Sequence, residues 1–212
     1  MTARRSPYRE PVLPETAARA LTEADWARAS DLSSRANWGE PWVVELYGSD
    51  PIRRWSAIHT ADEQGRFEQY SLHVGLFAGT AILASAVGSL EPDCYRCRWA
   101  EQSGEPGADE QLINWTFYQG VAEAHRDRPP HAWIGHVAVE PSLQGLGLGK
   151  ILMRATVELA RDRGSSTMLL ECQPHNVRFY ESVGFRVVKS FPDPLGPDAL
   201  LMAADLSRRP MV

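Results

Sequence analysis

The chain is most informative between Ala132 and Gly149, which read AWIGHVAVEPSLQGLGLG. The first eight residues are mostly β-branched, aromatic or small, so they predict a strand. A short loop follows, and the glycines then open a helix whose apolar residues recur at helical spacing. A strand that leads through glycines into a helix directs several backbone N–H groups, and the positive end of the helix dipole, toward one point. This segment therefore predicts a loop that binds a phosphate or a pyrophosphate.

Two common glycine-rich loops do not fit these residues. A Walker A loop requires four residues between its glycines and then Lys-Ser or Lys-Thr, whereas Gly145 and Gly149 enclose three residues and Ile151 follows Lys150. The dinucleotide fingerprint G-x-G-x-x-G requires a glycine where Lys150 stands. Both interpretations are excluded on residue identity.

The loop Gln144-Gly-Leu-Gly-Leu-Gly149 has the pattern Q-x-x-G-x-G, and Asn176 further along begins the segment NVRFYESVGF. The first pattern resembles the acetyl-CoA-binding loop of the GNAT superfamily of N-acetyltransferases. The second resembles that superfamily's segment N-x-x-x-F/Y-Y-x-x-x-G-F. The resemblance is specific over residues 131–189, extends loosely to about residue 205 and is faint over 16–90.

The resemblance implies a mixed α/β (α+β) fold. Its central sheet is mixed, mostly antiparallel, flanked by helices and splayed between the two central strands. We expect strands over 67–78, 80–90, 132–139, 167–172, 185–189 and 199–204, and helices near 22–32, 42–46, 110–127, 148–163 and 176–183. The domain organisation expected is a polar lead-in over 1–15 and a single domain over 16–212, with its cofactor-binding core at about 131–189.

Composition and charge exclude several classes of partner. The 212 residues carry a net charge of −5 and are 43% hydrophobic, which is typical of a globular protein without the basic footprint of a nucleic-acid-binding domain. The uncharged run from Gln69 to Leu90 could span a membrane by length, but three glycines interrupt it and two buried strands explain it. We therefore expect neither nucleic acid nor membrane as partner.

The cysteines and the N-terminus indicate an intracellular protein without a metal. Cys94 and Cys97 have C-x-x-C spacing, but a structural zinc site commonly needs a second pair, which the chain lacks. The third cysteine, Cys172, makes the count odd, unlike a disulfide framework. The first residues lack the apolar segment of a signal peptide, so a cytoplasmic location is expected.

The resemblance assigns acetyl-CoA as co-substrate. The N–H groups around the glycine loop would bind its pyrophosphate, and the backbone of the preceding strand would pair with the pantetheine arm. The residues expected to contact the cofactor are Val137, Ala138, Val139, Gln144, Gly145, Leu146, Gly147, Leu148, Gly149, Lys150, Asn176, Phe179 and Tyr180.

Two residues are the candidates for catalysis. The resemblance places Tyr180 beside the thioester sulfur, where its phenol, with an ordinary pKa of about 10, could protonate the leaving thiolate. His131 is the candidate general base because imidazole has a suitable ordinary pKa. The alternatives are a half-buried aromatic residue for Tyr180 and a surface histidine for His131. Alternation along the strand predicts that His136 faces the other way and is structural.

Glu171 and Glu140 are further candidates for the base, although Glu140 is better explained as a residue that shapes the loop. An aromatic acceptor cleft could be built from the N-terminal half, and its candidate residues are Trp26, Trp38, Trp42, Trp55, Tyr70 and Trp115. Packing in the core is the alternative for these side chains.

The predicted function is that of an N-acetyltransferase. It would move the acetyl group of acetyl-CoA to an amine by direct attack in a ternary complex, and the acceptor would be a small molecule or a protein or peptide amine. A non-catalytic acyl-CoA-binding or sensing domain, which keeps the loop but not the chemistry, is the alternative. The resemblance is also compatible with a homodimer.

Overall fold

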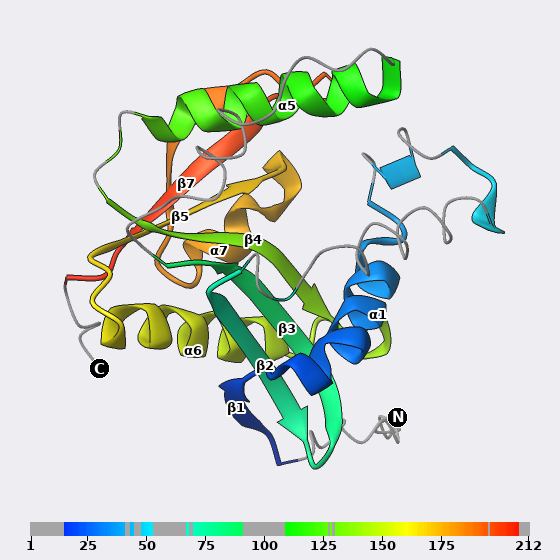
Figure 1. Cartoon of the computed structure of the whole chain (residues 1–212), viewed down its shortest axis with the longest axis vertical. Coiled ribbons are helices and arrows are strands. Elements are labelled where there is room, and N and C mark those ends of the chain that lie inside the picture. The colour runs from blue at the N-terminus through cyan, green and yellow to red at the C-terminus, as the bar shows by residue number, and fades with distance from the viewer. Residues whose placement is uncertain are drawn as a thin grey trace, which may run out of the picture.

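The structure is a computed structural model and describes residues 15–40, 43–44, 48–52, 67, 70–90, 109–126 (the backbone alone for 109–116 and 118), 128, 130–194 and 196–207. Within these residues seven strands form one sheet, in the order β1-β2-β3-β4-β5-β7-β6 (Figure 1). They are β1 (Ala17–Ala20), β2 (Leu72–Ala78), β3 (Ala81–Ser89), β4 (Ala132–Val139), β5 (Thr167–Cys172), β6 (Arg186–Phe191) and β7 (Ala199–Asp205). Strands β4 and β5 are parallel and the other neighbours are antiparallel, which confirms the predicted fold class.

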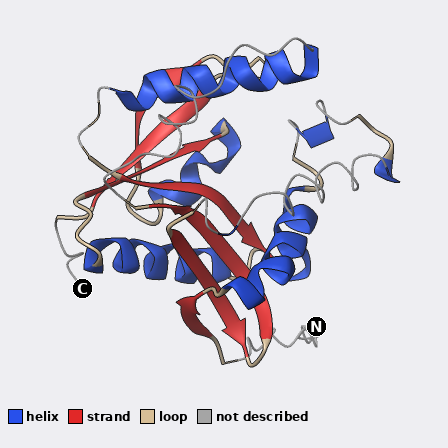
Figure 2. Ribbon diagram, in the orientation of Figure 1, coloured by secondary structure: helices blue, strands red, loops and turns tan. Residues whose placement is uncertain are grey.

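Helices flank this sheet (Figure 2). They are α1 (Trp26–Asn37), α5 (Asp109–Arg126), α6 (Leu148–Asp162) and α7 (Val177–Glu181), with 3₁₀ turns η1 (Glu23–Asp25), η3 (Pro141–Leu143) and η4 (Pro174–Asn176). Helix α6 buries Leu148, Leu152 and Met153 in the main core, together with residues of β2, β3 and β4. Helix α5 packs through Val121 and Ala124 in a separate cluster with residues of β5, β6 and β7.

The two central strands separate partway along their length. Pairing between β4 and β5 covers Ala132–Ile134 against Met168–Leu170. Strand β4 continues to Val139 and β5 to Cys172 beyond this short ladder. The diverging ends leave a space within the sheet, as the predicted splay requires, and the site described below occupies it.

Strand β4 carries an irregularity in its pairing with β3, close to this space. Its pairing with β3 joins His136 to Val87 and Ile134 to Gly88, so that Gly135 is passed over. An extra residue of this kind locally breaks the alternation of side chains on which facing arguments depend. The facing of residues on either side of Gly135 therefore cannot be counted from one continuous period of two.

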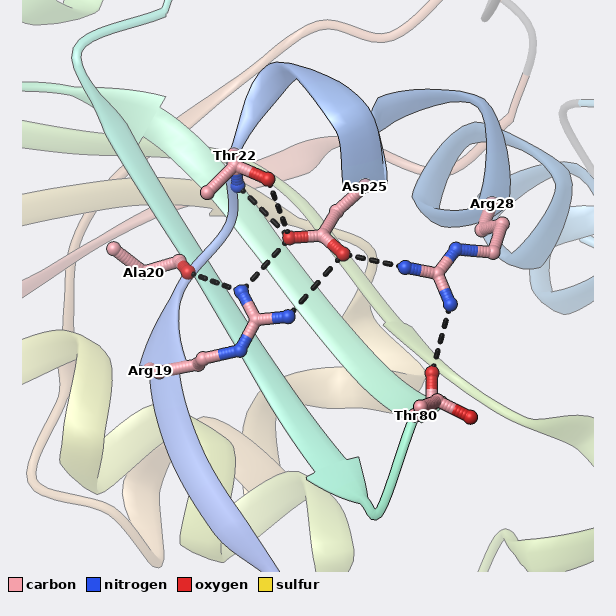
Figure 3. A network of polar contacts seen from close by, with 6 residues as sticks. All are labelled: Arg19, Ala20, Thr22, Asp25, Arg28 and Thr80. Carbon is pink, nitrogen blue, oxygen red and sulfur yellow. Dashed lines mark hydrogen bonds and ion pairs between the residues drawn. The ribbon is translucent and has the colours of Figure 1, made fainter.

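Strand β1 was not expected from the sequence and is held at the sheet edge by a buried carboxylate. Asp25 accepts hydrogen bonds from the backbone N–H of Thr22 at 3.0 Å and from its hydroxyl at 2.9 Å (Figure 3). Arg19 of β1 donates to both oxygens of Asp25, at 2.8 and 3.2 Å. Arg28 of α1 donates to Asp25 and also to the carbonyl of Thr80 in the β2–β3 turn. One carboxylate thus joins three elements, and its hydrogen bonds, first those with Arg19, lower its pKa well below the ordinary range.

The central strands and the strand pair before them agree closely with the sequence-based expectations. The bounds predicted for β4 and β5 are those observed, and the strand pair predicted within 67–90 is present as β2 and β3. No helix among the described residues is long and apolar enough to cross a membrane. Three features of the sequence analysis lie outside the described residues: most of the helix predicted near 42–46, residues 1–14 of the lead-in predicted over 1–15, and the pair Cys94 and Cys97.

Candidate active site

A cavity of about 640 Å³ lies where β4 and β5 separate. Its wall includes Val137 and Val139 of β4, Glu171 and Cys172 of β5, and Tyr180 of α7. Further lining residues come from the glycine loop, from the C-terminal end of α1 and from α5, and they include Ala36, Asn37, Glu40, Phe117, Gly145, Gly147, Lys150 and Asn176. Because α5 and α6 pack into different clusters of the core, the cavity receives residues from both faces of the sheet.

The glycine loop forms one end of the cavity. Gly145 and Gly147 adopt the left-handed region, with φ of +80° and +86°, which glycine reaches without steric cost. Gly147 is the N-cap of α6, and no side chain of the described residues caps this end of the helix. The first N–H groups of a helix have no acceptor within it, so those of Leu148 and Gly149 are available to an anion at this point.

Eleven of the thirteen residues expected to contact the cofactor line the cavity, and two do not. The two outside the wall are Ala138 and Leu146. Ala138 is buried and pairs with Ser85 of β3, and strand alternation directs its side chain away from the side that Val137 and Val139 present. Any contact of Ala138 with a ligand would therefore come through its backbone.

Tyr180 lies in the cavity wall on the short helix α7. Its ring packs edge-on against Phe179 and Phe185, with centroids 4.9 and 6.0 Å away. Burial, with smaller contributions from Cys172 and the carboxylates of Glu40 and Glu171, raises the pKa of the Tyr180 hydroxyl above its ordinary value of 10.0. The phenol therefore keeps its proton at neutral pH and is available as a donor.

Glu171 is the carboxylate at the point where the strands part. Trp133 Nε1 donates to both of its oxygens, at 3.2 and 3.0 Å, and His125 Nε2 lies 2.8 Å from Glu171 Oε1. The Glu171 side chain is 10% exposed and that of His125 is 0% exposed. A hydrogen bond to a charged group contributes about 1.5–3 kcal/mol, so these contacts fix the orientation of the carboxylate at the cavity wall.

Two histidines, one before β4 and one within it, occupy positions that the sequence did not predict. His131 does not line the cavity: it is buried, and its Nε2 lies 3.0 Å from His125 Nδ1, behind Glu171. His136, which was expected to be structural and to face the other way from His131, lines the cavity. That expectation assumed unbroken alternation from His131 to His136, and the irregularity at Gly135 lies between these two residues.

Cys172 also lines the cavity, but it is a poor nucleophile. Burial, and to a lesser extent the charge of Glu171, raises the pKa of its thiol to about 12. The thiolate is the reactive form of cysteine, so this thiol is inert at neutral pH.

Sequence patterns offered no reason to select His125, Trp133 or Phe117, because each reaches the site only through the fold. Of the residues suggested for an aromatic cleft, Trp26, Trp38 and Tyr70 are not part of the cavity wall, and Trp42, Trp55 and the Trp115 side chain lie outside the described residues. No group of three or more His, Cys, Asp or Glu residues that could hold a metal ion occurs in the described part of the chain.

Comparisons with known proteins agree with this geometry. Residues 40–185 match the family described as "Acetyltransferase (GNAT) family". An uncharacterised N-acetyltransferase of Porphyra purpurea is 38% identical over 66 residues, which are 31% of this chain and 38% of that protein. The chain spans only 38–40% of the length of the curated relatives it matches.

Two solved structures share the fold. A polyamine N-acetyltransferase of Drosophila melanogaster has a TM-score of 0.62 at 14% identity, over 89% of this chain and 98% of that one. An N-acetyltransferase of Thermoplasma acidophilum, solved in complex with coenzyme A, has a TM-score of 0.53 at 11% identity, over 90% of this chain and 99% of that one. At these identities the likeness concerns the fold alone.

Proposed function

The chain belongs to the GNAT family of acetyltransferases, and on that premise we propose that it transfers the acetyl group of acetyl-CoA to an amine by direct attack in a ternary complex. The observation that carries the proposal is a cavity that joins the anion-binding end of α6, the phenol of Tyr180 and the carboxylate of Glu171. A cofactor thioester and an acceptor amine could meet there.

The anchoring of acetyl-CoA would rest on backbone groups. The N–H groups of the loop from Gly145 to Lys150 and the dipole of α6 would hold the pyrophosphate. The edge of β4 after Ile134, which is not paired with β5, would carry the pantetheine arm past Val137 and Val139. An N–H on that edge would polarise the thioester carbonyl, an effect worth about 3–4 kcal/mol of the barrier.

The proton movements would be divided between two side chains. The acceptor arrives as an ammonium with an ordinary pKa of about 10.4, and the Glu171 carboxylate would take one proton from it before attack. The free amine attacks the thioester carbon, the C–S bond breaks, and Tyr180 would protonate the departing thiolate. The second proton lost by the amine nitrogen restores the phenol, so the reaction yields an amide, free coenzyme A and one proton.

Two further observations support direct attack on an amine. The buried thiol of Cys172, with its pKa of about 12, is not suited to carry the acetyl group in a covalent intermediate. Among the described residues, the cavity wall holds the carboxylates of Glu40, Glu171 and Asp193 against one lysine, Lys150 at the loop, a balance that favours a cationic acceptor.

The test is release of free thiol from acetyl-CoA in the presence of a panel of primary amines, with mass spectrometry of the acetylated product. We expect the wild type to release thiol only when an amine is present. In the variant Glu171→Gln, kcat should fall at least about a hundredfold. The matched control Glu181→Gln changes an exposed carboxylate of α7 and should match the wild type. Tight acetyl-CoA binding without thiol release on any amine would favour a sensing domain instead.

A further inference from the structure

Three side chains with N–H groups gather behind Glu171, on the side away from the cavity. His125 comes from the last turn of α5, Trp133 comes from β4, and His131 directly precedes that strand. His125 and Glu171 are 46 residues apart in the chain, and all four side chains are at least nine-tenths buried. Two of these side chains, His125 and Trp133, contact the carboxylate of Glu171 directly, and a carboxylate is oriented by the neighbours that donate hydrogens to it.

We propose that His131 and His125 form a positioning chain that fixes Glu171, with each hydrogen directed toward its carboxylate: His131 Nε2–H donates to His125 Nδ1, and His125 Nε2–H donates to Glu171 Oε1. The role of Glu171 as the base rests on the proposed function above, but the chain of hydrogen bonds does not.

The direction of the positioning chain follows from the donor inventory. The indole N–H of Trp133 can only donate, and it contacts both oxygens of Glu171. An ionised carboxylate can only accept, so His125 carries a hydrogen on Nε2, and where the His125 ring is neutral its Nδ1 is an acceptor. His131 Nε2, 3.0 Å away, must then be a donor. A hydrogen bond donated by His131 to Nδ1 stabilises this same tautomer of His125, which holds the carboxylate.

A glycine in β4 makes room for the third side chain, the indole of Trp133. A Cβ on Gly135 would lie 2.2 Å from Cη2 of Trp133, so the indole ring lies directly against the glycine. Trp133 is 0% exposed, and in this position its Nε1 lies within hydrogen-bond distance of the Glu171 carboxylate. The absence of a side chain at Gly135 thus allows the indole to reach the carboxylate from the strand that His131 precedes.

Other titratable groups share the surroundings of Glu171. They come from the segment after α1, from α5, β4 and its preceding residue, β5, α7 and the segment after β6, and they are Glu40, His125, His131, His136, Cys172, Tyr180 and Asp193. Substitutions in the positioning chain leave the cavity-lining members of this set in place. Because each substitution also removes an imidazole, the loss of a donor to Glu171 is measured as the difference in pH dependence between a variant that keeps a donor and one that removes it.

The first test is ¹⁵N NMR of the imidazole rings in the apo protein at pH 7, assigned with His125 and His131 variants. We expect the hydrogen of His125 on Nε2 with Nδ1 bare, and a hydrogen on His131 Nε2. A hydrogen on His125 Nδ1, whether or not Nε2 also carries one, would overturn the proposal. This measurement needs neither substrate nor activity, so the positioning chain can fail while the acetyltransferase assignment stands, and the reverse.

The second test compares His125→Gln with His125→Leu. Glutamine keeps a donor near the position of Nε2, and we expect its kcat/KM to stay within about threefold of the wild type. Leucine removes the donor, so kcat should fall at least about tenfold at pH 7 with little change in KM. The acidic limb of the pH profile should also move up by about one unit, because the ionised carboxylate loses a donor.

Identical pH profiles for His125→Leu and the wild type would contradict the proposal. Thermal melting of both variants separates loss of structure from loss of positioning. If His125→Leu does not fold, the tautomer measurement and the matched pair His131→Gln and His131→Leu decide the question by the same criteria.

Discussion

Arg35, in the last turn of α1, donates a hydrogen bond from Nη1 to Glu140, which lies 105 positions later and caps the turn η3 that leads into the glycine loop. Its Nε also donates to Asp31 on the same helix, at 3.0 Å. These two partners raise the pKa of the Arg35 guanidinium, first through Glu140. The contact connects the helix that borders the cavity to the loop that would bind the cofactor.

Replacing Arg35 with methionine tests how much this connection contributes to cofactor binding. Both side chains are partly exposed, at 37% and 25%, and such ion pairs contribute at most about 1 kcal/mol. We therefore expect coenzyme A to bind at most about fivefold more weakly, with the melting temperature nearly unchanged. Titration calorimetry measures the affinity, and a loss larger than a hundredfold would show that Arg35 itself contacts the ligand.

Asp25→Asn should destabilise the N-terminal edge of the sheet without affecting the cavity. The change removes the charge that Arg19 and Arg28 share, and we expect a loss of about 2 kcal/mol, or about 4–8 °C in Tm for a chain of this size. Because the folded pKa of Asp25 is lowered, its stabilisation is complete above the unfolded value of about 4 and is lost as pH falls below it.

The difference in unfolding free energy between the wild type and Asp25→Asn should therefore shrink in acid. Urea unfolding at pH 7 and pH 3 measures it, with the exposed Asp162→Asn as the matched control. An equal difference at both pH values would contradict the charged network.

Tyr180→Phe should lower kcat by at least about a hundredfold while acetyl-CoA still binds, since the ring contacts with Phe179 and Phe185 remain. The raised pKa of the hydroxyl also predicts that the wild-type pH profile has no basic limb from Tyr180 up to about pH 10. Steady-state kinetics from about pH 6 to 10 checks both points. A phenylalanine variant with unchanged kcat would remove Tyr180 from the mechanism.

Cys172→Ala should retain activity within about threefold, because a thiol with a pKa of about 12 has no role as a nucleophile. Mass spectrometry of the protein after incubation with acetyl-CoA alone should find no acetyl group on Cys172. An acetylated Cys172 that disappears when amine is added would replace direct attack with a two-step transfer.

The fold could be predicted best where local signals and chain order agree. The strands Ala132–Val139 and Thr167–Cys172 are apolar runs bounded by turn residues, and their bounds were predicted to the residue. Strand β1 was missed because AARA has little strand propensity and all four residues are exposed. Its position depends on pairing with β2 and on the contact of Arg19 with Asp25 and Phe77.

The residues of the candidate site fall into two similar groups: those that a local motif predicts and those that reach the site only through the fold. The loop from Gln144 to Lys150 and Tyr180 could be selected because their motifs are contiguous in the chain. The contact of His125 with Glu171 could not, because it depends on how α5 packs across the sheet. The place of His136 in the cavity wall was not predicted, and the irregularity at Gly135 interrupts the alternation counted from His131.

The central claim, that the N-terminus of α6 binds the diphosphate of coenzyme A, is tested most directly by calorimetry on two glycine variants. Gly147 and Gly164 lie at opposite ends of α6, both at positive φ and both with open space where a Cβ would lie, so aspartate imposes a similar backbone strain at each. We predict that Gly147→Asp weakens coenzyme A binding at least about tenfold through repulsion of the phosphates, while Gly164→Asp binds as the wild type. Equal affinities for the two variants would contradict the account.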